Sequence, residues 1–234
     1  MMLSVRDLCK SYVRPRESVV ALAGVSLDIA EGELVAVRGP SGCGKTTLLL
    51  AIGGLLAPDA GVVEVCGQNP YSLAPNHRAA FRAATVGFVF QQFHLVPYLS
   101  VLENVMAPVL ARPVPDAEAR ARGLLEQFGL AERSTHLPGE LSTGERQRTA
   151  LARAMLSSPK LILADEPTGN LDEDNARDVL TSLADFAKSG GAVLLVTHDS
   201  AVAGHADRTL QMESGRLREP PDGALLCLGR AAEH

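Results

Sequence analysis

The sequence predicts an α/β fold: a core with a mostly parallel sheet, a small antiparallel sheet near the N-terminus, and a helical insertion. Four stretches are short and apolar throughout: residues 34–37, 86–90, 161–164 and 192–196. Strands that are apolar on both faces are typical of parallel sheets covered by helices. Residues 3–9 and 25–29 instead alternate between apolar and polar side chains, which predicts half-buried antiparallel strands. Helical patterns dominate between residues 92 and 159, which predicts the insertion.

Length and composition fit one domain that carries this insertion. The chain has 234 residues, of which 46% are hydrophobic, enough to bury a sizeable core. We expect a single domain over residues 1–218. Within it, residues 1–91 and 160–218 are expected to form the α/β core with its antiparallel part, and residues 92–159 the helical subdomain. The tail at 219–234 carries no readable signal.

Charge and cysteine content argue against several classes of partner and site. The net charge of −5 gives no basic field for a polyanion, so no nucleic acid partner is expected. The four cysteines include no Cys-x-x-Cys pair, which argues against a zinc site or disulfide framework and favours a reducing, cytoplasmic compartment. The longest apolar run, residues 48–57, is shorter than the roughly 20 residues that span a bilayer, so we expect a buried helix there. Any membrane role would then need a partner chain.

The chain is organised around a glycine-rich loop between an expected strand and an expected helix. The loop reads Gly39, Pro40, Ser41, Gly42, Cys43, Gly44, Lys45 and Thr46, the pattern G-x-x-x-x-G-K-T. Its glycines let backbone N–H groups approach a phosphate chain closely, and the new helix points its unpaired N–H groups at the same anion. Lys45 can reach the terminal phosphates, and the Thr46 hydroxyl can bind a magnesium ion that bridges them. The pattern therefore predicts a nucleotide phosphate site.

The other elements are expected on either side of this loop. Tyr12 is expected in a polar loop, either as a surface aromatic or as a ring stacked on a nucleotide base. A turn at 58–61 leads into a strand at 62–66, and Asn76 can cap a short helix. Further helices are expected from Ser100 to Pro108, at 116–128, from Ser142 to Pro159 and at 173–188, two of them opened by capping boxes.

Polar side chains follow the strands of the predicted parallel sheet. Gln91, Asp165 with Glu166, and His198 each stand just after an apolar strand. Because the carboxyl ends of parallel strands meet at one edge, these groups can gather around one nucleotide. Asp165 and, more weakly, Gln91 suit a magnesium shell. Glu166 can deprotonate an attacking water, and His198 can donate a hydrogen bond to the transferred phosphoryl group.

A further motif resembles one family within the P-loop (RecA-like) NTPases. Residues 141–147, Leu-Ser-Thr-Gly-Glu-Arg-Gln, resemble the signature motif of ABC ATPases, and the motifs already described follow that family's order over about residues 3 to 218. Residues 90–97, 103–105 and 167–172 look like the branch of lipoprotein-releasing, macrolide-exporting and cell-division ATPases. The resemblance implies ATP and Mg²⁺ as cofactors. The residues it implies for ATP are Tyr12, Gly39, Pro40, Ser41, Gly42, Cys43, Gly44, Lys45, Thr46, Thr47 and Gln91, with Thr46, Gln91 and Asp165 for the metal and Glu166 and His198 for catalysis.

The resemblance also implies a head-to-tail dimer, a homodimer or a heterodimer, with two ATP molecules between the subunits. The signature residues Ser142, Thr143, Gly144 and Glu145 would contact the ATP held by the partner, and Asp172 would lie at the dimer contact. Bare N–H groups at the start of a helix make such an anion contact physically sensible. Ser142 and Glu145 can equally well just cap their own helix. The family usually has glycine at position 143, and the β-branched Thr143 tolerates fewer backbone dihedrals, so we expect a modest penalty or none.

Membrane permease subunits are the implied partners, and we expect them to dock near residues 93–103, between Phe93 and Glu103. This stretch is unusually apolar and aromatic for a loop, as a groove for a short helix requires. Internal packing of the insertion is the alternative. The chain is thus interpreted as the ATP-hydrolysing subunit of an ABC transporter that powers export or extraction, cytoplasmic and peripheral on the inner face of the cell membrane. The principal alternative is a regulatory ATPase of the cell-division kind, and a soluble DNA-repair or translation ATPase is a weaker one.

Overall fold

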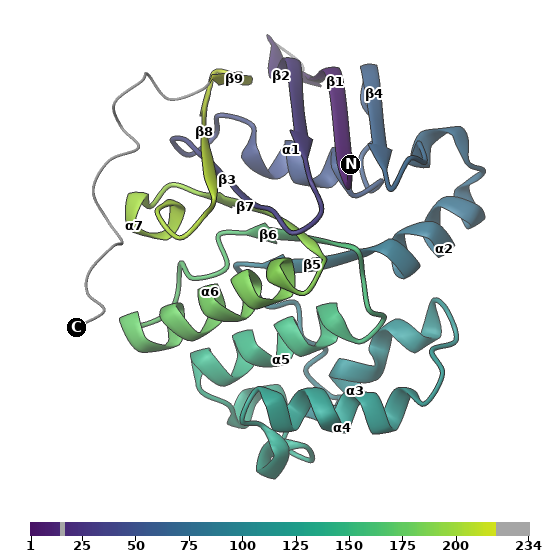
Figure 1. Ribbon diagram of the computed structural model, residues 1–234, viewed down its shortest axis with the longest axis vertical. Coiled ribbons are helices and arrows are strands. Elements are labelled where there is room, and N and C mark those ends of the chain that lie inside the picture. The colour runs from purple at the N-terminus through teal and green to yellow at the C-terminus, as the bar shows by residue number, and fades with distance from the viewer. Residues whose placement is uncertain (15–16, 219–234) are drawn as a thin grey trace.

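The computed structural model describes residues 1–14 and 17–218 and contains two sheets. A three-stranded antiparallel sheet has the order β2-β1-β4, and a six-stranded sheet has the order β5-β6-β7-β3-β8-β9 (Figure 1). The strands are β1 (Leu3–Arg14), β2 (Glu17–Ile29), β3 (Leu34–Arg38), β4 (Ala60–Val65), β5 (Val86–Phe90), β6 (Leu161–Asp165), β7 (Ala192–Thr197), β8 (Arg208–Glu213) and β9 (Arg216–Arg218). The predicted mixed α/β architecture is confirmed, and the predicted tail at 219–234 lies outside the described residues.

The helices fill the space between the sheets and cover the far side of the larger sheet. They are α1 (Lys45–Ile52), α2 (Pro75–Thr85), α3 (Val101–Met106), α4 (Ala117–Gln127), α5 (Thr143–Met155), α6 (Glu173–Lys188) and α7 (Ser200–Ala203). Short 3₁₀ turns are η1 (Pro70–Ser72), η2 (Ala107–Leu110), η3 (Ala131–Arg133) and η4 (Pro138–Glu140). In the described part of the chain, no helix combines the length and the apolar character needed to cross a membrane.

Two hydrophobic clusters lie on opposite faces of the six-stranded sheet. One joins that sheet to α1 and to the antiparallel sheet, with Leu48 and Ile52 of α1 fully buried. The other joins the opposite face to α3, α4, α5 and α6, where Leu151 and Leu183 are fully buried. Figure 1 shows the same layers, with α1 between the two sheets and the helical insertion on the other side of the large sheet. This arrangement explains why the central strands are apolar on both faces.

The register of the parallel strands brings their carboxyl ends to one edge. Phe90 at the end of β5 is level with Asp165 at the end of β6, and Asp165 is level with Val196 of β7. In turn, Arg38 at the end of β3 is level with Thr197. The residues that follow these four strands therefore emerge side by side, as the sequence predicts. The crossover helix between β6 and β7 is α6, which has the predicted bounds.

Several local predictions are wrong, beginning with Tyr12 and the extent of the helix expected at 48–57. Tyr12 lies in strand β1 rather than in a loop, because the β1–β2 hairpin continues past Lys10 through register shifts and pairs Tyr12 with Val19. The sequence gives no strand pattern there because neither face of this end of the hairpin is buried; even Val13 is 91% accessible. The buried helix expected over 48–57 already ends at Ile52, because the chain turns at Gly53 and Gly54, the latter with φ of 70°.

Two helices of the insertion begin where their capping residues predict, but α5 ends at Met155, before the Pro159 expected to break it. Ser100 and Glu103 form a complete capping box at the start of α3, and Ser142 and Glu145 form another at the start of α5. Helix α3 ends at Met106, and a 3₁₀ turn that includes Pro108 follows it. One cap is misassigned: Asn76 lies inside α2, which begins with Pro75 at its first position, where the missing N–H costs nothing.

Candidate active site

The phosphate loop joins β3 to α1 and requires glycine at specific points. Gly44 has a φ of 112°, and a Cβ atom there would overlap the carbonyl oxygen of Ala21. Gly39 has an ordinary φ, but a Cβ atom there would overlap the carbonyl oxygen of Met212. No side chain caps the start of α1, so its first N–H groups are directed into the loop. The loop can therefore present backbone N–H groups to an anion at close range.

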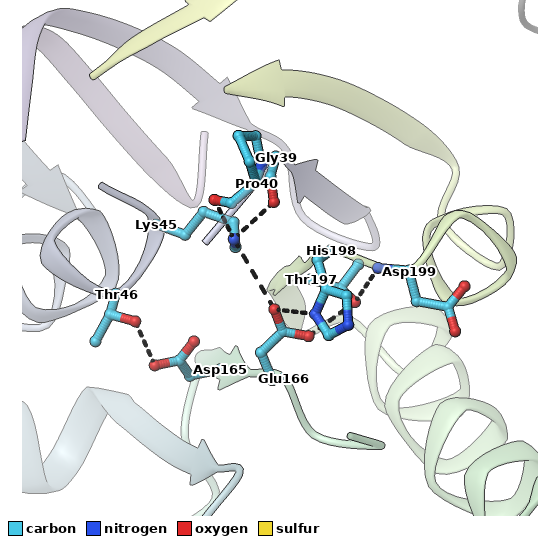
Figure 2. Close-up of polar contacts among 9 residues, drawn as sticks. All are labelled: Gly39, Pro40, Lys45, Thr46, Asp165, Glu166, Thr197, His198 and Asp199. Atoms are coloured by element: carbon cyan, nitrogen blue, oxygen red, sulfur yellow. Dashed lines mark hydrogen bonds and ion pairs between the residues drawn. The ribbon is translucent and has the colours of Figure 1, made fainter. Parts of the chain in front are cut away.

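Lys45 lies under this loop and is 93% buried, since only 7% of it is accessible. Its ammonium group donates hydrogen bonds to the carbonyl oxygens of Gly39 at 2.8 Å and Pro40 at 3.0 Å. The same Nζ atom is 3.9 Å from Oε1 of Glu166 (Figure 2). These contacts hold one positive charge between the phosphate loop and the end of β6. A phosphate bound by the loop would lie next to that charge.

Thr46 and Asp165 form a pair of oxygen groups at the mouth of the site. The Thr46 hydroxyl donates to Oδ2 of Asp165 at 2.8 Å, across 119 positions of sequence (Figure 2). Burial raises the pKa of the Asp165 carboxyl, while the hydrogen bond from Thr46 opposes that shift. The described residues contain no group of three or more His, Cys, Asp or Glu side chains placed to hold a metal ion by themselves. Mg²⁺ takes one or two protein oxygens and completes its shell with water and phosphate, so this hydroxyl–carboxylate pair suits it.

Glu166 turns away from the end of β6 through a left-handed backbone conformation with φ of 46°. Its Oε2 accepts a hydrogen bond from the Thr197 hydroxyl at 3.0 Å. Its Oε1 is 2.9 Å from Nδ1 of His198, which must be protonated there because a carboxylate only accepts. Both partners come from the end of β7 (Figure 2). Glu166 is thereby fixed beside Lys45 with its carboxylate oriented, which is the geometry a general base needs.

These groups line one cleft with a volume of about 410 Å³. Its lining residues are Tyr12, Val19, Ala21, Ser41, Gly42, Gly44, Lys45, Thr46, Thr47, Gln91, Asp165 and Glu166. The Tyr12 hydroxyl lies 3.4 Å from that of Thr47, and the Tyr12 ring is partly exposed at the rim. Gln91 borders the cleft, and its backbone oxygen accepts a hydrogen bond from Asn170. The structure therefore brings most of the predicted nucleotide residues together.

The signature residues lie elsewhere, at the start of α5, and none of them is among the described residues that line the cleft. Ser142 and Glu145 cap the helix as expected, and Arg133 holds the Glu145 carboxylate at 2.9 Å. The backbone N–H of Ser142 and then Arg133 lower the pKa of Glu145. Thr143 is the first residue of α5 and has no positive φ, so its backbone conformation is one that threonine adopts readily.

Asp172 caps helix α6 and is not part of the cleft lining either. Its carboxylate accepts hydrogen bonds from the backbone and side-chain N–H groups of Asn175. Those bonds lower the pKa of Asp172. Within one chain, Asp172 and the signature residues therefore lie apart from the cleft at the phosphate loop.

The stretch at 93–103 combines packed and exposed side chains. Phe93 is half-buried, with the Arg146 guanidinium 5.7 Å from its ring centre, and Arg153 donates to the carbonyl oxygens of Phe93 and His94, each at 2.6 Å. Tyr98 is 79% accessible. A nearby hollow of about 200 Å³ lies between β5, the 3₁₀ turn at Ala107–Leu110 and α5. Internal packing thus accounts for Phe93, while Tyr98 remains available to a partner.

Sequence reasoning missed several residues of the site. Val19 and Ala21 line the cleft from β2, and nothing in their composition distinguishes them from other strand residues. Thr197 orients Glu166, and its position at the end of an apolar strand was a usable signal. Asn175 contacts the signature helix, and no sequence pattern points to that contact.

The fold and the cleft define a P-loop nucleotide-binding protein with the groups needed for phosphoanhydride hydrolysis. The family model described as "ABC transporter" matches residues 22–169, and the chain belongs to that family. It is 46% identical over 219 residues to the lipoprotein-releasing system ATP-binding protein LolD 1 of Rhodopirellula baltica, covering 92% of this chain and 96% of that protein. It is also 46% identical over 220 residues to a LolD of Pseudomonas syringae, covering 93% and 97%.

Solved structures agree with this assignment. The dimeric post-hydrolysis structure of the ATP-binding cassette MJ0796, bound to ADP and phosphate, superposes with a TM-score of 0.86 at 35% identity, covering 94% of this chain and 98% of that one. These findings confirm the prediction of an ATP-hydrolysing subunit of an ABC transporter complex that uses ATP and Mg²⁺. The dimeric solved structure and the transporter family also agree with the predicted kinds of partner, a second ATPase subunit and membrane permease subunits.

Proposed function

We propose that this chain hydrolyses ATP at the cleft between β3, β6 and β7 and thereby powers the release of lipoproteins from a membrane. The observation that carries the proposal is the placement of Glu166, which His198 and Thr197 orient beside Lys45 at the phosphate loop. The lipoprotein substrate is inferred from the named relatives, which match nearly the whole chain.

Each predicted site residue receives a role within this proposal. The N–H groups of the loop from Gly39 to Thr47 and the Lys45 ammonium bind the phosphates, and Tyr12 stacks on the base. Thr46, Asp165 and Gln91 serve Mg²⁺, which when bound would neutralise charge that develops on the phosphate oxygens. Glu166 accepts the proton of the attacking water.

His198 supports the transferred phosphoryl group in this proposal, with one physical condition. A neutral imidazole that donates Nδ1–H to Glu166 has only a lone pair left on Nε2. His198 must therefore carry two protons, or turn away from Glu166, to donate a hydrogen bond to a phosphate oxygen. Either change alters the environment of Glu166 at the moment when phosphate is contacted.

The second subunit supplies the remaining groups. We assign Ser142, Thr143, Gly144 and Glu145 to the ATP held by the partner subunit, and Asp172 to the dimer contact. Their separation from the cleft of their own chain supports this assignment. Permease subunits would dock near residues 93–103, with Tyr98 as the most exposed aromatic of that stretch. The chain would then be held at the cytoplasmic face of the membrane by those subunits.

The test is to express the tagged Glu166→Gln variant in its own host, solubilise the membranes gently with Mg-ATP and identify the proteins that co-purify. A permease with several membrane spans, accompanied by lipid-modified proteins, is the expected result. The same preparation of the wild-type chain should hydrolyse ATP, and its rate should respond to added lipoprotein.

Two outcomes would contradict the proposal. A membrane partner that recruits cell-wall enzymes, with no lipoprotein bound, would favour the regulatory ATPase of the cell-division kind. Recovery of soluble proteins or nucleic acid without a membrane partner would remove the transporter role.

A further inference from the structure

We propose that Asn175 is a positioning residue that fixes the signature residues relative to the dimer-contact residue Asp172. Asn175 lies in the first turn of α6 and Gly144 in the first turn of α5, so the two helix starts meet at this point. The proposal rests on the proposed function, in which both Gly144 and Asp172 face the second subunit.

The side-chain amide of Asn175 makes contacts in two directions. Its oxygen accepts a hydrogen bond from Arg148 of α5 at 2.6 Å. Its NH₂ group donates to both carboxylate oxygens of Asp172, at 2.9 Å and 2.8 Å. A flipped amide would set its oxygen against the carboxylate and its NH₂ group against the guanidinium, so these partners determine its orientation. The amide therefore links a residue of the signature helix to Asp172.

The lack of a side chain at Gly144 allows the close contact between Asn175 and α5. Gly144 is buried, lies within α5 and has a negative φ, so its backbone conformation does not require glycine. A Cβ atom at position 144 would instead overlap Oδ1 and Cγ of Asn175. The absence of a side chain at Gly144 thus lets the Asn175 amide sit directly against the backbone of the signature motif.

Helix α5 also contacts the chain between β6 and α6, through Gln147. Gln147 is fully buried, and its side-chain NH₂ group donates to the carbonyl oxygen of Pro167 at 2.6 Å. Pro167 directly follows Glu166, so α5 contacts the segment 167–172 at both of its ends: at Pro167 through Gln147, and at Asp172 through Asn175. A shift of Asn175 would consequently move Asp172 relative to the backbone N–H groups of Thr143 and Gly144.

The test is a double-mutant cycle in the Glu166→Gln background, where ATP is expected to accumulate the dimer. Sedimentation velocity measures the fraction of dimer, and the quantity compared between variants is the ATP concentration at which that fraction is half of its maximum. We expect Asn175→Ala to raise this concentration threefold to tenfold and Gly144→Ala to raise it at least tenfold. We expect Gly144→Ala/Asn175→Ala to match Asn175→Ala within twofold, because the added methyl group no longer meets an amide. Arg177→Ala, an exposed position of the same helix, is the matched control and should change nothing.

If the double variant raised the half-maximal ATP concentration by the product of the two single factors, the proposal would be overturned, since Gly144 would then be required for a reason that does not involve Asn175. Failure of the parent Glu166→Gln chain to dimerise with ATP would instead contradict the proposed function. Affinity of the monomeric chain for fluorescent ATP, measured at protein concentrations too low for dimerisation, should stay within twofold when Asn175→Ala is added to the parent, because Asn175 does not line the cleft. If Gly144→Ala does not fold, the cycle of Arg148→Ala with Asn175→Ala replaces it, and additivity there would again overturn the proposal.

Discussion

Tyr71 holds the end of α1, the helix that starts at the phosphate loop, and replacing it by phenylalanine tests that role. The hydroxyl of Tyr71 lies 2.5 Å from the carbonyl oxygen of Ala51 and 2.6 Å from that of Leu56. These carbonyl groups belong to the last turn of α1 and to the chain beyond it. The Ala51 oxygen also accepts the backbone N–H of Gly54 at 3.2 Å, whereas the described residues show no other donor to the Leu56 oxygen. Tyr71→Phe removes the donor and keeps the ring.

The size of the effect follows from these contacts. A hydroxyl has one proton, so one hydrogen bond is lost at a time, worth about 0.5–1.5 kcal/mol net. The Leu56 carbonyl oxygen would be left without a donor among the described residues, and an unsatisfied acceptor brings the cost to about 1–3 kcal/mol. Since 1 kcal/mol shifts Tm by about 2–4 °C in a chain of this length, we expect Tm to fall by about 2–12 °C. Nucleotide affinity should change less than threefold, because Tyr71 does not line the cleft.

The pH dependence gives an independent readout of the same residue. Burial raises the pKa of Tyr71 from 10.0 to about 12. The folded state therefore holds this proton more tightly than the unfolded state, and the associated stability is complete below pH 10 and lost as pH rises from about 10 towards about 12. Phenylalanine has no such proton, so the difference in stability between wild type and Tyr71→Phe should shrink across that window.

Thermal and chemical unfolding followed by circular dichroism measure these effects. Tyr98→Phe is the matched control, because Tyr98 is 79% accessible, and its free energy of unfolding should stay within about 0.5 kcal/mol of wild type. An unchanged Tm for Tyr71→Phe, or an equal effect in the control, would refute the reasoning.

Three further predictions concern the site. Glu166→Gln keeps the shape of the side chain but removes the base, so phosphate release should fall about 10²- to 10⁴-fold while ATP still binds; an unchanged rate would remove Glu166 from its role. Because burial raises the pKa of Asp165, its ionised form costs stability that is absent at low pH and grows as pH rises through the folded pKa. Asp165→Asn should therefore raise the nucleotide-free Tm at pH 7, by about 2–4 °C per kcal/mol regained, with a smaller gain near pH 4; equal gains at both pH values would contradict this. Thr143→Gly should alter the ATPase rate less than threefold, because Thr143 has an unstrained helical backbone, and a hundredfold rise would show that the native signature is impaired.

The phosphate loop and the strand ends were predictable because local rules determine them. Gly44 needs a positive φ, and Lys45 and Thr46 follow it at a fixed spacing. An apolar run predicts each strand, and the polar residue after the run marks the end of that strand. The parallel register then aligns those ends without any further information from the sequence. Capping boxes at Ser100 and Ser142 located two helix starts for the same local reason.

Other features depend on neighbours that are distant in the sequence. The continuation of β1 through Tyr12 is determined by pairing with β2, and its exposed, polar side chains carry no periodic signal. Strand β8 was not predicted because its burial comes from packing beside β3, and β9 is only three residues long. The contact of Asn175 with Gly144 joins two capped helices whose sequences are fully explained without it.

The left-handed backbone of Glu166 has a consequence for selection and engineering. Its φ of 46° costs about 1–2 kcal/mol for a residue with a side chain, and glycine would relieve that strain. Random libraries screened only for heat resistance should therefore enrich glycine, and to a lesser extent asparagine, at position 166. Such variants would be more robust and catalytically inert, so a screen of this protein for stability must also require turnover.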